Sequence, residues 1–186
     1  MKSLLLAFAP FIAFAGLERL VGIVPGLLAA AALSLALIVR DALASDRHVK
    51  LLEVGSVALF GGLAGYALVS DVSGWNVLGV RLAVDAGLCV IVALSLLLDR
   101  PFTLPYARER VPAEVWAQPR FLRTNRVLST VWLVAFAALV AADVLMLYVP
   151  QLPLAVGIAL SAAALVAAFK FSQWYPEQVR AAAARA

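Results

Sequence analysis

Cysteine and histidine are almost absent from this chain of 186 residues, which has one of each. The single cysteine, Cys89, cannot form a disulfide or a thiolate cluster within the chain. The single histidine, His48, has no further histidine or cysteine with which to complete a tetrahedral zinc site. We therefore expect no tightly bound metal and no other cofactor. Secreted disulfide scaffolds are excluded by the same scarcity.

Charged residues are scarce as well. They make up 14% of the chain, against 65% for apolar residues, whereas an ordinary soluble domain has about 25% charged and about 45–50% apolar residues. A soluble fold of this length could not bury so much apolar surface. The longest stretch without an apolar run, residues 99–126, is too short for a soluble catalytic domain. Cytosolic enzymes and nucleic-acid binders are thereby excluded, and an integral membrane protein is predicted.

Long apolar runs are what the chain has instead. A hydrocarbon core of about 30 Å needs about 20 helical residues, and six runs approach that length: residues 3–21, 25–39, 51–70, 75–98, 127–148 and 152–174. We predict an all-α fold, a polytopic transmembrane helical bundle of about six spans that forms a single domain over residues 1–186. Tight turns are expected at residues 22–26 and 149–153.

The first run permits two interpretations. A basic residue followed by an apolar stretch and the small residues Ala13, Ala15 and Gly16 imitates a cleavable signal peptide. The alternative, which we favour because a polytopic protein follows, is an uncleaved span with a kink at Pro10.

The basic residues indicate the orientation of the spans. If the chain starts in the cytoplasm, thirteen of its fifteen lysines and arginines fall on the cytoplasmic side, and only Arg19 and Arg81 fall on the other. Cytoplasmic loops carry such an excess. We therefore expect both termini in the cytoplasm, and the net charge of +4 requires no nucleic-acid partner.

Small residues indicate where helices approach one another. Gly61 and Gly65 form a GxxxG pair, and such pairs allow close packing of helix backbones in lipid. We expect this pair to pack within the bundle, and the alternative is a seam between two copies of the chain.

Five charged residues are predicted to form one layer in the outer half of the membrane, about 20–26 Å from the cytoplasmic ends of their helices at about 1.5 Å per residue. They are Glu18, Arg19, Arg81, Asp85 and Asp143. Arg81 and Asp85 are four residues apart and can pair on one helix. Asp143 is surrounded in the sequence by apolar residues and should face the bundle interior.

The layer has two interpretations. We favour ion pairs that hold helices in register, and the alternative is a proton or solute site that opens outward. Glu53 and Lys170 lie near cytoplasmic ends, where long charged side chains reach the interface.

The predicted cytoplasmic interfacial loop, residues 99–126, is the most distinctive segment. Its four prolines prevent one continuous helix, and aromatic residues are interleaved with arginines. Aromatic rings prefer the headgroup region, and each basic residue near an anionic leaflet contributes about 1 kcal/mol. We expect the loop to lie on the inner surface of the membrane and to contact anionic headgroups, with a protein partner as the alternative. The candidate contact residues are Phe102, Tyr106, Arg108, Arg110, Trp116, Phe121 and Arg123.

Several motifs resemble those of the intracellular septation protein A family of the bacterial inner membrane. They are Phe60-Gly61-Gly62-Leu63, Arg100-Pro101-Phe102, Glu109, Pro112, Val115, Trp116, Asn125, Trp132 and Phe136. As a divergent relative, the chain would be a small non-enzymatic membrane protein that supports envelope synthesis and septation by contacting envelope or division proteins. The resemblance supplies no catalytic residues.

Two other functions are weighed against this one. The first is a small transporter or proton-coupled channel that uses the membrane-embedded carboxylates. The second, a membrane enzyme, is the weakest, because His48 lies in a polar loop and no Ser-His-Asp arrangement is evident.

Overall fold

The computed structural model describes residues 2–43, 50–70 and 74–184 of the chain. Within these residues all regular structure is helical, which confirms the predicted all-α class. The helices group into two compact units, Met1–Ile91 and Val92–Ala186, and each unit is described by itself.

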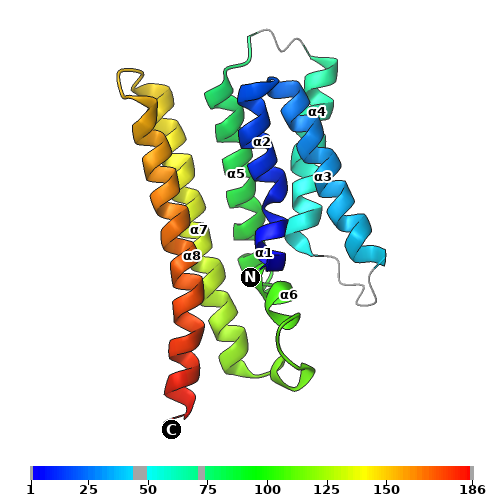
Figure 1. Ribbon diagram of the computed structural model, residues 1–186, viewed down its shortest axis with the longest axis vertical. Coiled ribbons are helices and arrows are strands. Elements are labelled where there is room, and N and C mark those ends of the chain that lie inside the picture. Colours follow the sequence, from blue (N-terminus) through cyan, green and yellow to red (C-terminus); the bar gives the residue numbers. More distant parts are fainter. Residues whose placement is uncertain (1, 44–49, 71–73, 185–186) are drawn as a thin grey trace. The chain divides into compact units, whose positions relative to one another are not determined.

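The first unit is built from five helices, the last of which continues into the second unit: α1 (Lys2–Ala7), α2 (Ala9–Leu20), α3 (Ile23–Leu43), α4 (Leu51–Val69) and α5 (Val77–Leu97) (Figure 1). Helix α3 packs against both α2 and α4. The chain reverses between α2 and α3 at Gly22, whose φ of +100° is readily adopted only by glycine. This turn is shorter than predicted, because Pro25 already lies in the first turn of α3, where its missing N–H costs no hydrogen bond.

The first apolar run does not form one helix. It is divided at Phe8 into α1 and α2, two residues before Pro10. Proline has no N–H to donate to the carbonyl four residues earlier, and its ring clashes with that carbonyl. The Phe8 amide instead donates to the Leu5 carbonyl at 3.1 Å, three residues back. The kink predicted at Pro10 is therefore present, as a break between two short helices.

Phenylalanine side chains form the centre of the first unit. Phe60 of α4 is fully buried, and its ring centroid lies 4.9 Å from that of Phe11 and 5.9 Å from that of Phe14, both on α2. Val80 and Val84 of α5 belong to the same core. Phe60, which begins one of the motifs noted above, thus contributes to packing.

Helices α4 and α5 approach each other through glycines other than the predicted pair. A Cβ atom at Gly55 would lie 2.8 Å from the nearest side-chain atom of α5, and one at Gly87 would lie 2.4 Å from the nearest side-chain atom of α4. A Cβ at Gly61 or Gly65 would meet no described atom within 4 Å. The predicted packing of Gly61 and Gly65 within the bundle is therefore absent from the first unit, where both are exposed. A seam between two copies stays a prediction.

The second unit contains the end of α5 and four further helices: α6 (Thr103–Arg108), η1 (Ala113–Val115), α7 (Pro119–Tyr148) and α8 (Leu154–Ala184). Helices α7 and α8 pack against each other as a long hairpin, and the chain turns between them where predicted (Figure 1). They have 30 and 31 residues, or about 45 Å each, which exceeds a hydrocarbon core of about 30 Å. Helix α7 begins at Pro119 and not at residue 127, so the last part of the predicted loop is helical.

Five of the helices, α3, α4, α5, α7 and α8, are long and apolar enough to cross a membrane. They coincide with the second to sixth of the predicted spans. By length and composition, the chain therefore has the helices of a polytopic membrane protein.

Candidate functional site

Two members of the predicted polar layer meet inside the first unit. Glu18 of α2 is buried, with 4% of its surface exposed, and its Oε1 lies 3.9 Å from Nε of Arg81 on α5. The guanidinium compensates a carboxylate that is costly among apolar helices. This ion pair connects two helices that are far apart in the sequence.

The other three members of the layer lie elsewhere. Arg19 follows Glu18 on α2 but is exposed, and Asp85 is half-buried on α5, one turn after Arg81. Asp143 is 3% exposed on α7, which belongs to the second unit. The structure thus brings Glu18 and Arg81 together. The pairing of Arg81 with Asp85 and the single layer of five residues stay predictions.

The start of α6 is attached to α7 by buried hydroxyl and amide groups. Thr103 Oγ1 donates to the Asn125 carbonyl oxygen at 3.0 Å and lies 3.0 Å from Ser129 Oγ. Asn125 Nδ2 donates to the Phe121 carbonyl on its own helix at 2.9 Å. Thr103, Asn125 and Ser129 are buried, so breaking these bonds would leave polar groups unpaired in the interior. The segment after α5 is therefore held against α7, one of the long apolar helices.

Serine side chains also satisfy the first amides of α6. The Phe102 N–H donates to Ser95 Oγ at 3.2 Å, and that hydroxyl donates to the Val92 carbonyl at 2.7 Å. The Thr103 N–H donates to Ser129 Oγ at 3.4 Å. The first amides of a helix have no acceptor within that helix. Here α5 and α7 supply the acceptors. Sequence reasoning did not single out these serines, although hydroxyl side chains inside apolar runs were a signal for such a role.

The candidate contact residues of the predicted loop differ in exposure. Phe102 and Tyr106 are 1% and 3% exposed, so these two rings belong to the interior and not to the predicted contact surface. The reason is that α6 is a helix, which places both on one face. Trp116 is half-buried: its Nε1 donates to the Val111 carbonyl at 3.2 Å, and the Arg108 guanidinium lies 5.3 Å from its ring centroid. The remaining candidates, exposed or half-buried, are Arg110, Phe121 and Arg123.

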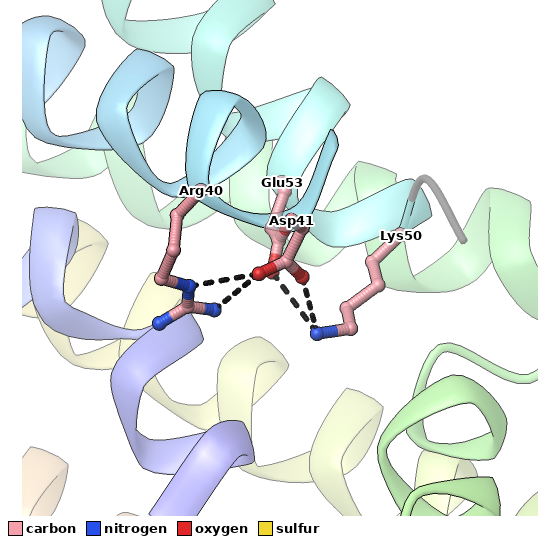
Figure 2. A network of polar contacts seen from close by, with 4 residues as sticks. All are labelled: Arg40, Asp41, Lys50 and Glu53. Atoms are coloured by element: carbon pink, nitrogen blue, oxygen red, sulfur yellow. Dashed lines mark hydrogen bonds and ion pairs between the residues drawn. The ribbon is translucent and has the colours of Figure 1, made fainter. Parts of the chain in front are cut away.

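A network of four charged residues joins the end of α3 to the start of α4 (Figure 2). Arg40 donates to Asp41 Oδ1 through Nε at 2.8 Å and through Nη2 at 2.6 Å. Lys50 Nζ lies 2.5 Å from Asp41 Oδ2 and 3.7 Å from Glu53 Oε1. Lys50 and Glu53 are 5% and 2% exposed, so the prediction that Glu53 reaches the interface is wrong.

Little in the amino-acid sequence indicates this network. Asp41 and Lys50 are nine residues apart, and spacing alone does not show that the ends of α3 and α4 bring them together. The predicted second span also ended at residue 39, whereas α3 continues to Leu43 and carries Asp41 on its last turn. His48 and Arg47, which lie between these helices, are outside the described residues.

Among the described residues, no group of three or more histidine, cysteine, aspartate or glutamate side chains is placed to hold a metal ion. No family model, no curated protein and no solved structure matches the chain. Its function is therefore inferred from its own residues.

Proposed function

We propose that the chain crosses a bacterial inner membrane six times, with both termini in the cytoplasm. Five apolar helices supply five crossings. Helices α1 and α2 together extend over residues 2–20, close to the length of about 20 residues that a crossing requires. The basic residues support this orientation, because thirteen of fifteen then lie on the cytoplasmic side.

We further propose that the protein supports cell-envelope synthesis or septation through protein and lipid contacts, without catalysis. The resemblance to the intracellular septation protein A family favours this role. The observation that carries it concerns Asn125 and Trp132, two residues of the motifs that resemble this family. Both make contacts between helices of the second unit. Asn125 belongs to the group that binds α6, and Trp132 Nε1 on α7 donates to Ser172 Oγ on α8 at 3.0 Å. The segment between α5 and α7 is thus held in a defined shape, as a contact surface requires.

The exposed arginines give this surface its chemistry. Arg110, Arg120 and Arg123 are exposed around the segment. Each contributes about 1 kcal/mol of attraction when it lies near an anionic leaflet. Anionic headgroups, or an acidic surface on an envelope or division protein, are the partners that fit these side chains.

Deletion of the gene in the source bacterium tests this role. We expect altered cell length or septum placement, restored by the parent chain but not by the double variant Arg110→Gln plus Arg123→Gln. Arg19→Gln is the matched control, because Arg19 is exposed on α2 of the first unit and is not part of the segment. Normal cell length and normal septa in the deletion strain would contradict the proposal.

A small transporter or proton-coupled channel is the second candidate, and the buried carboxylates favour it. Glu18 and Asp143 are 4% and 3% exposed, and ionisable groups inside membrane helices commonly mark ion pathways. Proton flux into proteoliposomes should be compared for the parent and for Asp85→Asn plus Asp143→Asn. Flux that only the parent supports would favour transport, whereas equal and negligible flux in both would favour the contact role.

A further inference from the structure

Two carboxyl groups and one ammonium group lie together at the junction of α3 and α4 (Figure 2). Lys50 Nζ is within hydrogen-bond distance of Asp41 Oδ2, at 2.5 Å, but it is 3.7 Å from Glu53 Oε1, which is an ion-pair distance and not a hydrogen bond. Asp41 also accepts two hydrogen bonds from Arg40. The cationic groups of the network therefore lie closer to the Asp41 carboxylate than to the Glu53 carboxylate.

Glu53 is the buried carboxyl group of the network whose hydrogen bonding these contacts leave incomplete. Its side chain is 2% exposed, and no donor in the described parts of the chain makes a hydrogen bond to Oε2. An ionised carboxylate in such a position is strongly disfavoured, because it has lost its hydration without gaining donors. The neighbouring negative charge of Asp41 disfavours ionisation further. These two effects favour uptake of a proton, and the Lys50 ammonium, at ion-pair distance from Oε1, opposes them.

A metal ion fits this position less well than a proton does. Calcium takes six to eight oxygen ligands, and magnesium takes six in an octahedral arrangement. Here two carboxyl groups are available, and the Lys50 ammonium already forms ion pairs with both (Figure 2). No third carboxylate, histidine or cysteine joins them among the described residues. A proton requires only the single oxygen Oε2.

We propose that Glu53 is a proton-binding site, which exchanges a proton with water at this end of the α3–α4 hairpin. With the proton on Oε2, Glu53 is neutral and Lys50 balances Asp41. When the proton leaves to water, Lys50 has to balance two carboxylates. The charged groups that face Glu53 are Arg40 and Asp41 from α3 and Lys50 at the start of α4. This site is separate from the predicted layer that contains Asp85 and Asp143, and it does not depend on the proposed role in septation.

Infrared difference spectroscopy of the purified full-length protein in lipid nanodiscs tests the proposal. A protonated carboxyl group has a C=O stretching band that neither a carboxylate nor a glutamine amide shares. We expect the parent to show such a band at mildly acidic pH and to lose it at alkaline pH, and we expect Glu53→Gln to lack this component. Glu177→Gln is the control, because Glu177 is exposed on α8 and should leave the band unchanged.

A second variant keeps the test valid if Glu53→Gln does not fold. With carbon-13 in the glutamate side-chain carboxyl, the labelled part of the band should be smaller in Glu53→Asp than in the parent. Bands of equal size in the parent and in Glu53→Gln at every pH would overturn the proposal, as would a labelled band of equal size in the parent and in Glu53→Asp.

Discussion

Glycines on the same helix of this protein have different neighbours, and their replacement should have different effects. A Cβ at Gly55 would lie 2.8 Å from three side-chain atoms of Ile91, whose branched side chain has little freedom to move away. We expect Gly55→Ala to lower the stability by about 1–3 kcal/mol through overpacking. Gly61→Ala meets open space, and should instead raise stability by about 0.5–1 kcal/mol, since alanine favours helix. Thermal unfolding in detergent measures both, and equal losses of Tm would contradict the assignment of the packed face.

The position of this packed face explains why Gly61 and Gly65 do not pack within the first unit. Phe60, Ala64 and Ala67 are buried in the first unit, and they define the inner face of α4. Gly61 follows Phe60 by about 100° around the helix and therefore points away from that face. The spacing of Gly61 and Gly65 shows that a small-residue face exists. Which face is covered depends on side chains of other helices, and local spacing does not contain that information.

At the scale of elements, the Thr103 hydroxyl is central to the attachment of α6 to α7. Thr103→Val keeps the shape of the side chain but removes the hydroxyl that donates to the Asn125 carbonyl oxygen and pairs with Ser129 Oγ. The loss of about 1–3 kcal/mol should increase hydrogen exchange of the α6 amides by about tenfold or more. Thr130→Val is the matched control, because the exposed Thr130 hydroxyl bonds only within its own helix, to the Arg126 carbonyl. Unchanged exchange in α6 of Thr103→Val would refute this role for the hydroxyl.

The segment that α6 begins is also where lipid composition should have an effect. A polarity-sensitive dye on Glu114→Cys, in a Cys89→Ser background, reports on the exposed turn η1. In nanodiscs we expect a blue shift when anionic lipid is added. We expect high salt, or Arg110→Gln plus Arg123→Gln, to reverse it, because both remove the attraction between arginines and headgroups. An emission spectrum that is insensitive to anionic lipid would favour a protein partner.

Elements were predictable from the sequence where one physical effect dominates. Apolar runs of membrane length identified α3, α4, α5, α7 and α8, because water-free surroundings require such runs to be helical. The first eight residues of α7 were missed because their arginines exclude them from a hydrocarbon core, although Pro119 at the first helical position was a usable start signal. Helix α6 was missed because it is short and is stabilised by Ser95 and Ser129 from other helices.

At the scale of the whole molecule, the two long helices of the second unit carry their basic residues at adjacent ends. The arginines of α7 lie in its first turns, and Lys170 and Arg180 lie in the second half of α8, which packs against α7 as an antiparallel hairpin. Helices of about 45 Å extend beyond the hydrocarbon core at one end or both. The charged ends are the parts that can remain in water, so the lengths of the helices and the positive-inside rule favour the same orientation.

This orientation predicts which positions an impermeant thiol reagent can reach. In a Cys89→Ser background, Gln151→Cys, exposed in the turn between α7 and α8, should be labelled in intact cells. Glu114→Cys, exposed in η1, should be labelled only after the cells are permeabilised. A peptide tag at the N-terminus should likewise resist added protease until permeabilisation, because an even number of crossings places it on the same side as Glu114. Labelling of Glu114→Cys in intact cells would reverse the orientation of every helix. Digestion of the tag in intact cells, without labelling of Glu114→Cys, would show that α1 and α2 do not cross the membrane. The chain would then have five crossings.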